Sequence, residues 1–135
     1  MRVAEILGQF SLFADLAPPQ LEAIAQSYEE SVFAEGERVL RRGLASGDFF
    51  VILEGEAVVE AGEGEIRLGR GEFFGEISAL TGEAPAAHVV AASLLRCLVI
   101  PGAQLERLLL ERPQLMLRLL RIEAGRLRGT LGWQP

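Results

Sequence analysis

Residues 75 and 76, a glycine followed by a glutamate, are the pair in this sequence best suited to holding a small polar ligand. They precede a stretch that favours a short helical turn, whose first backbone N–H groups lack partners within the helix and can point at an anion. Gly75 has no Cβ, so another group can approach its backbone closely. The carboxylate of Glu76 repels an anion and suits a hydroxyl donor instead. The pair therefore offers backbone N–H groups that can point at an anion and a carboxylate that suits a sugar hydroxyl.

Residue types that could support catalysis are scarce, because the chain has one histidine, His88, and one cysteine, Cys97. Any Ser-His-Asp or Cys-His set would depend on that single histidine, and cupin-type enzymes usually need two or three histidines with a carboxylate. We expect no enzyme activity, no catalytic residue and no metal site. Cys97 alternates with Leu98 in an apolar strand, which predicts a core residue. His88 is expected on a strand at the barrel wall or rim.

The composition indicates a globular protein of one domain. The chain has 135 residues, half of them apolar, which is enough to bury a hydrophobic core. No apolar run approaches the roughly 20 residues of a membrane-spanning helix, and the N-terminus lacks the pattern of a secretory signal. The single cysteine fits a reducing compartment, so a cytoplasmic location is expected. A net charge of -6 argues against direct nucleic-acid contact by this chain.

The middle of the chain predicts many short β-strands. From residue 28 to residue 100 the apolar residues follow a period of two, and glycines such as Gly43, Gly55 and Gly71 close successive segments. Strands spaced by about 8–12 residues are typical of a sandwich or jelly roll. Helical spacing predicts short N-terminal helices over 1–27. The expected fold class is therefore mainly β, with flanking helices.

The C-terminal segment, 102–130, predicts two helices, of which the second and longer begins near Pro113. The longer helix carries two apolar stripes: Leu115, Leu119 and Ile122 form the first, and Met116, Leu120 and Leu127 form the second. One stripe is enough to cover a barrel end, so the second predicts a homodimer through this helix. The alternative is that both stripes pack on the chain's own barrel. Three arginines of the polar face are expected to be solvated: Arg118, Arg121 and Arg128.

Two stretches of the sequence resemble the signatures of cyclic-nucleotide-binding domains. The first runs from Glu35 to Gly43 and continues from Gly47 to Gly55. The second runs from Phe74 to Glu83, continues from Ala86 to Ala91, and is similar to that family's phosphate-binding cassette. The resemblance covers roughly residues 5–130, and it implies a double-stranded β-helix (jelly roll) in a single domain over 1–135. The jelly roll itself would occupy 28–100.

The resemblance also implies roles for individual residues. Glu76 would bond the ribose 2′-hydroxyl of cyclic AMP or cyclic GMP, and N–H groups near Gly75, Ile77 and Ala87 would line the pocket. Thr130, late in the last helix, falls where relatives can present a threonine to the purine.

The sequence departs from the family where the cyclic phosphate should be held. Counting along the cassette, the position of the family's phosphate-binding arginine falls on Pro85, and that of the adjacent hydroxyl on Ala86. Loss of a charge-assisted hydrogen bond costs about 1.5–3 kcal/mol, which is roughly one to two orders of magnitude in affinity. We therefore expect weak cyclic-nucleotide binding or a different small-molecule ligand. Other nearby arginines are expected to be solvated: Arg41, Arg42, Arg67 and Arg70.

The predicted function is a non-catalytic regulatory or sensor module, dimeric through its last helix, with no DNA-binding domain and no membrane contact in this chain. Two alternatives stay open. The chain could be a degenerate copy that binds no nucleotide and serves dimerisation or protein docking. It could also be the effector half of a longer transcription regulator that resembles catabolite-activator-type proteins.

Overall fold

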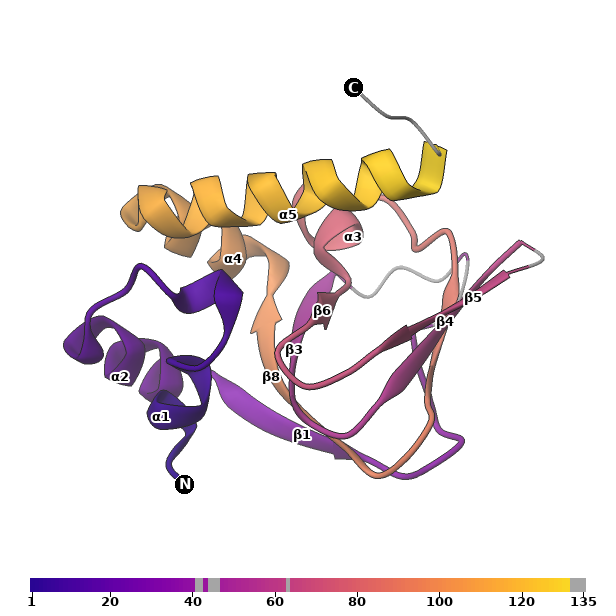
Figure 1. The fold of residues 1–135 in the computed structure, drawn as a ribbon, viewed down its shortest axis with the longest axis horizontal. Coiled ribbons are helices and arrows are strands. Elements are labelled where there is room, and N and C mark those ends of the chain that lie inside the picture. The colour runs from indigo at the N-terminus through magenta and orange to yellow at the C-terminus, as the bar shows by residue number, and fades with distance from the viewer. Residues whose placement is uncertain (41–42, 44–46, 63, 132–135) are drawn as a thin grey trace.

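The computed structural model describes residues 1–40, 43, 47–62 and 64–131, without the side chains of residues 61, 130 and 131. Two antiparallel sheets form a β-roll, with the first helices on one flank and the longest helix across its top (Figure 1). The helices are α1 (Val3–Leu7), the 3-10 helix η1 (Ser11–Phe13), α2 (Pro18–Ser27), α3 (Glu76–Thr81), α4 (Gly102–Glu111) and α5 (Pro113–Leu131). The strands are β1 (Glu29–Phe33), β2 (Arg38–Leu40), β3 (Asp48–Glu54), β4 (Ala57–Ala61), β5 (Gly64–Leu68), β6 (Phe73–Phe74), β7 (His88–Ala91) and β8 (Leu95–Pro101).

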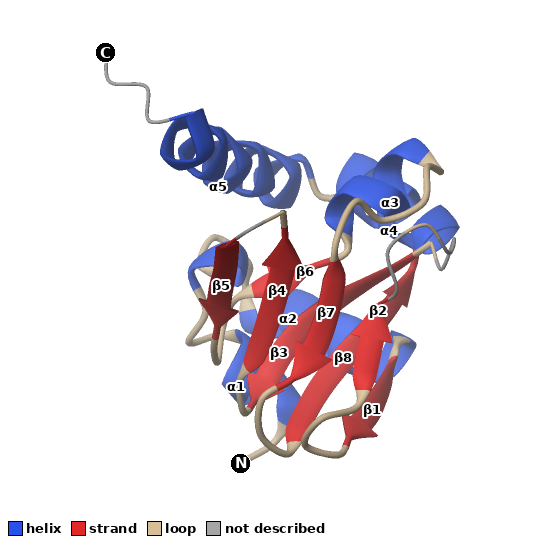
Figure 2. Cartoon of the chain, turned by 90° about the vertical axis from the view of Figure 1, so that its right-hand side faces the viewer, coloured by secondary structure: helices blue, strands red, loops and turns tan. Residues whose placement is uncertain are grey.

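The strand order confirms the mainly β jelly roll that the sequence predicts. One sheet has the order β1-β8-β3-β6 and the other has the order β2-β7-β4-β5, with neighbouring strands antiparallel. Figure 2 shows the second sheet lying in front of the first, so that the two sheets enclose an interior between them. The flanking short N-terminal helices and the long C-terminal helix are also present as predicted.

Strand β3 is apolar on both faces because it contributes to two separate hydrophobic cores. Its side chains alternate in direction, as they must in an extended strand. Phe49 and Val51 join the core under the helices, whereas Phe50 and Ile52 join the core between the two sheets. All four are at most 5% exposed. This double burial explains why the sequence shows an uninterrupted apolar run there.

Helix α5 buries one of its two apolar stripes and exposes the other. Leu115 and Leu119 are 3% and 4% exposed, and they pack into the core under the helices. The second stripe lies on the surface: Met116, Leu120 and Leu127 are 39%, 62% and 59% exposed. The alternative in which both stripes pack on the chain's own barrel is therefore wrong. Neither α5 nor another helix among the described residues has the apolar length needed to span a membrane.

On the polar face of α5, Arg118 is less exposed to solvent than the sequence suggests. The Arg118 guanidinium donates to both carboxylate oxygens of Asp15, at distances of 2.9 to 3.2 Å. Its side chain is 29% exposed. Asp15 follows η1, so this ion pair ties the first half of α5 to the N-terminal helices.

Candidate ligand-binding site

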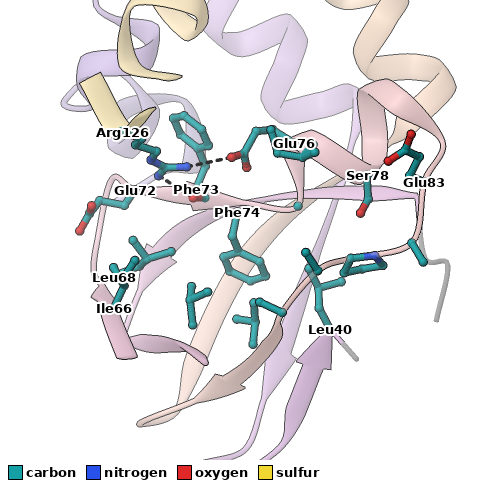
Figure 3. A pocket seen from close by; sticks show the side chains of 18 of the residues that line it. Leu40, Ile66, Leu68, Glu72, Phe73, Phe74, Glu76, Ser78, Glu83 and Arg126 are labelled. Carbon is teal, nitrogen blue, oxygen red and sulfur yellow. Dashed lines mark hydrogen bonds and ion pairs between the residues drawn. The ribbon is translucent and has the colours of Figure 1, made fainter. Parts of the chain in front are cut away.

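A cavity of about 620 Å³ lies between the β2-β7-β4-β5 sheet, the loop after α3 and the second half of α5 (Figure 3). This volume is within the range of small-molecule sites in proteins. Its walls are largely apolar, and they include Leu40, Val59, Leu68, Phe74 and Val89. The predicted residues Gly75, Glu76, Ile77, Ala86 and Ala87 all line it as well.

Gly75 is required by its surroundings as well as by its backbone conformation. Its φ of 85° is in the left-handed region, which favours glycine. A Cβ at this position would meet the carbonyl oxygen of Asp48 at 2.4 Å. The chain therefore turns tightly between β6 and α3, and this turn directs the first residue of α3, Glu76, toward the cavity.

Glu76 is a buried carboxylate with one satisfied and one unsatisfied oxygen. The residue is 6% exposed, and its Oε1 accepts a hydrogen bond from Nη1 of Arg126 at 3.0 Å. Its Oε2 is fully buried and has no hydrogen-bond partner among the described residues. A buried acceptor without a donor is costly, so this oxygen can gain from a donor that a ligand brings.

Arg126 reaches from α5 across the cavity rim to Glu76 (Figure 3). Besides Glu76, it donates to the carbonyl oxygen of Phe73 at 2.8 Å and to Oε1 of Glu123 at 3.4 Å. Its guanidinium also lies 4.2 Å from the centroid of the Phe73 ring. We call Glu76, Glu123 and Arg126 the latch cluster, because they join α3 to α5.

Glu123 is the second carboxylate of the latch cluster. Its pKa is raised to about 7, first by burial and then by the negative charge of Glu76, against the opposing charge of Arg126. The Glu123 carboxyl therefore exchanges a proton with solvent near neutral pH.

The sequence analysis missed Arg126, although the sequence contains a signal for it. Arg126 follows Leu115, Leu119 and Ile122 at i+11, so it extends the buried stripe of α5. A lone arginine on an otherwise apolar inner face indicates a charged partner inside. The partner, Glu76, is fifty residues away in the sequence.

The loop after α3 offers little to a phosphate, as the sequence predicts. Pro85 is buried, has no N–H, and its carbonyl oxygen already accepts from the N–H of Gly43 at 2.9 Å. Ala86 is exposed and Ala87 is half-buried, and neither has a polar side chain. Side-chain donors at the family's phosphate position are therefore absent from this loop.

Of the remaining residues that the sequence singled out, Arg67 lines the cavity with a largely exposed side chain. Cys97 and His88 are not among the lining residues. Cys97 is fully buried between the sheets, and burial raises its pKa to about 12, so it is a core residue as predicted. His88 is half-buried on β7, opposite Glu60. The side chain of Thr130 lies outside the described residues, as do Arg41 and Arg42, so their roles stay predictions.

The fold and the cavity define a class of protein: a β-roll with a small-molecule-sized cavity that is lined in part by its C-terminal helix. The described residues contain no group of three or more histidine, cysteine or acidic side chains that could hold a metal ion. The chain belongs to the cyclic nucleotide-binding domain family, whose model matches residues 30–112.

Individual relatives extend this likeness over most of the chain. A Rhodopseudomonas palustris protein, provisionally named a potassium channel protein, is 34% identical over 125 residues, which cover 90% of this chain and 30% of that protein. The Thermus thermophilus catabolite activator protein matches with a TM-score of 0.80 and 24% identity, covering 89% of this chain and 59% of its own. The regulatory domain of Toxoplasma gondii PKA, solved with cAMP, matches with a TM-score of 0.78 and 21% identity, covering 92% and 49%. The chain thus spans less than a third of the curated relative.

Proposed function

We propose that this chain is a non-catalytic sensor domain that binds a small molecule in the 620 Å³ cavity and reports its presence through α5. The observation that carries the proposal is the position of the latch cluster. Glu76 lines the cavity, and the same carboxylate holds Arg126 of α5. A ligand that engages Glu76 therefore acts on the same carboxylate that positions the second half of α5.

Cyclic nucleotides are the first ligands to test, because the PKA relative was solved with cAMP. We expect titration calorimetry with cAMP and cGMP to give weak binding, since Pro85 and Ala86 lack side-chain donors for the phosphate. The double substitution Pro85→Arg with Ala86→Ser restores both donors. If the cavity is a cyclic-nucleotide site, this variant binds about tenfold or more tightly than the wild type. Equal affinities would show that the phosphate does not occupy this loop.

A second candidate function is a protein-docking or dimerisation module that binds no nucleotide. Its support is the same pair, Pro85 and Ala86, which removes the phosphate grip while leaving the fold intact. Thermal unfolding distinguishes the two functions. A saturable rise in melting temperature with a small molecule supports the sensor, and no rise with any cavity-sized ligand supports the docking module.

The exposed face of α5 supports self-association in either case. Leu117, Leu120, Ala124 and Leu127 are exposed and spaced by three, four and three residues, which is the heptad spacing of a two-stranded coiled coil. We place a second copy of α5 against this face. Sedimentation should show a dimer for the wild type and a monomer for the double substitution Leu120→Glu with Leu127→Glu. A monomeric wild type at micromolar concentration would contradict the pairing.

The output of the sensor depends on the protein that contains it. Two of the relatives that it matches are longer than this chain: one is a catabolite activator protein, and the other is provisionally named a potassium channel protein. We place this chain in the cytoplasm as the regulatory part of such a system, without direct nucleic-acid contact of its own. Its net charge of -6 supports this placement. Electrophoretic mobility shift with random duplex DNA should show no retardation.

A further inference from the structure

We propose that the cavity selects a largely apolar ligand that is not an anion and that donates a hydrogen bond to Oε2 of Glu76. This inference rests on the proposed function, since it names the chemical class of the small molecule that the cavity holds. Three features of the described residues carry it: the charge of the lining, the unsatisfied oxygen of Glu76 and the apolar walls.

The charged groups of the lining disfavour an anion. Among the described residues, three acidic side chains line the cavity, namely Glu72, Glu76 and Glu83, against two basic ones, Arg67 and Arg126. Both arginines are already engaged with carboxylates. Arg67 donates to Oε2 of Glu56 at 3.1 Å, and Arg126 holds Glu76 and Glu123. An anion could recruit Arg126 only by competing with these carboxylates in a partly desolvated site, whereas the pair of Arg67 with Glu56 is exposed to solvent.

The loop that grips phosphate in the family gives an anion no side-chain donor at residues 85 and 86. Pro85 lacks an N–H, and the methyl group of Ala86 cannot donate a hydrogen bond. The Pro85 carbonyl is fixed by the N–H of Gly43 at 2.9 Å, and a carbonyl oxygen repels an anion as well.

The unsatisfied oxygen of Glu76 specifies a donor on the ligand. Glu76 is only 6% exposed, and its Oε2 has no hydrogen-bond partner among the described residues. Arg126 occupies Oε1, so Oε2 is the oxygen of Glu76 that still lacks a donor. A hydroxyl or an ammonium group satisfies this oxygen, whereas a carboxylate or phosphate leaves it unsatisfied and repelled.

The remaining walls suit a hydrocarbon or aromatic body. Phe74 stacks on Phe50 with ring centroids 4.8 Å apart, and it forms an apolar surface at the cavity with Val59, Leu68 and Val89. A ligand body in van der Waals contact with these side chains is stabilised by apolar burial. The donor end then lies at Glu76.

The test compares probes that differ in charge but share a body. Adenosine and cAMP share purine and ribose, and only cAMP carries the phosphate anion. 1-Naphthylmethylamine and 1-naphthoate share an aromatic body, with an ammonium in one and a carboxylate in the other. Calorimetry at pH 7.5 should show each non-anionic probe binding about tenfold or more tightly than its anionic counterpart.

Each outcome of this comparison decides the inference. An anion that binds as tightly as its counterpart, or more tightly, overturns the charge selectivity and leaves the proposed small-molecule function intact. If none of the four probes binds, both the selectivity and the proposed function fail. The comparison uses the wild-type protein, so it does not depend on whether a variant folds.

The substitution Glu76→Gln assigns the selectivity to the buried carboxylate. We expect it to weaken the naphthylmethylamine complex about tenfold or more, because a neutral amide replaces the charged acceptor. Glu83→Gln is the matched control: Glu83 also lines the cavity but is exposed, so we expect a change of less than about threefold. Equal effects of the two substitutions would show that general charge, not Oε2 of Glu76, selects the ligand.

Discussion

The two halves of α5 are held against the molecule by opposite kinds of contact. The first half inserts Leu115 and Leu119 into the core under the helices, where the space left among the packed side chains is only about 10 Å³. The second half lies over a cavity of about 620 Å³, and it is held there by the latch cluster of Glu76, Glu123 and Arg126.

This difference indicates which half of the helix can respond to a ligand. Apolar burial at native packing density has no competitor in solvent, so the first half is a fixed anchor. The contacts of the second half are ion pairs and hydrogen bonds, which a ligand's donor or a change in protonation can replace. A signal from the cavity would therefore move the second half of α5 relative to its anchor.

The largest effect is expected from the substitution Leu119→Ala, which lies in the first half of α5, the half that we infer to be the anchor. Removing this buried side chain should lower the free energy of unfolding by about 2–5 kcal/mol, because a cavity remains in a tightly packed core. Urea denaturation measures the loss. Leu110→Ala in α4 is the control, since Leu110 is 65% exposed, and its cost should be below about 0.5 kcal/mol. Similar losses for both variants would mean that the first half of α5 is not an anchor.

A smaller effect is expected from Arg126→Met in the latch half. The substitution leaves the buried Glu76 without its cation, and it should cost about 1–3 kcal/mol, less than a fully buried pair because the arginine side chain is 31% exposed. Hydrogen exchange should quicken only in the second half of α5.

A double-mutant cycle isolates the ion pair itself. Adding Glu76→Gln to Arg126→Met removes the unpaired charge, so the double variant should be more stable than the sum of the single losses implies. Strictly additive losses would show that the two side chains do not stabilise one another.

The sequence could predict the parts of this site that are local. The Gly75-Glu76 turn, the missing donors at Pro85 and Ala86, and the exposed second stripe of α5 all follow from short-range patterns. Their physical causes act within a few residues: backbone conformation, side-chain chemistry and helical spacing.

The latch cluster could not be derived in the same way. It joins α3 to α5 across fifty residues, so only the tertiary fold brings Arg126 to Glu76. The sequence could have indicated that Arg126 faces inward, because it lies on the stripe of Leu115 and Leu119, but not which carboxylate it meets. The pKa of Glu123 likewise depends on burial and on Glu76, neither of which a local pattern contains.

A pH titration tests the latch half through Glu123. Its pKa is raised to about 7 in the folded protein from an ordinary value of 4.5, so the folded state binds more protons between these values. The contribution of Glu123 to stability is therefore present at low pH and is lost as pH rises from about 5 to about 7.5. After allowance for the partial exposure of its side chain, the loss should be on the order of 1 kcal/mol.

The variant Glu123→Gln identifies the source of this pH dependence. Other groups, including Asp48 with its pKa raised by burial, add their own slopes, but they are common to both proteins. The difference in unfolding free energy between wild type and variant should therefore change between pH 5 and pH 7.5 and stay constant above about pH 8. If the difference in unfolding free energy does not change across this pH range, the titrating group is not Glu123.

The smallest effect is expected from Arg118→Ala, and it sharpens what anchors the first half of α5. Arg118 bonds both oxygens of Asp15, but the two side chains are 29% and 46% exposed, so solvent screens the pair. The loss should be about 0.3–1 kcal/mol and should shrink further in 1 M salt, whereas the loss from Leu119→Ala should persist there. If Arg118→Ala instead cost as much as Leu119→Ala, the anchor would be ionic too. The two halves of the helix would then differ in burial alone, and a ligand's charge could loosen either of them.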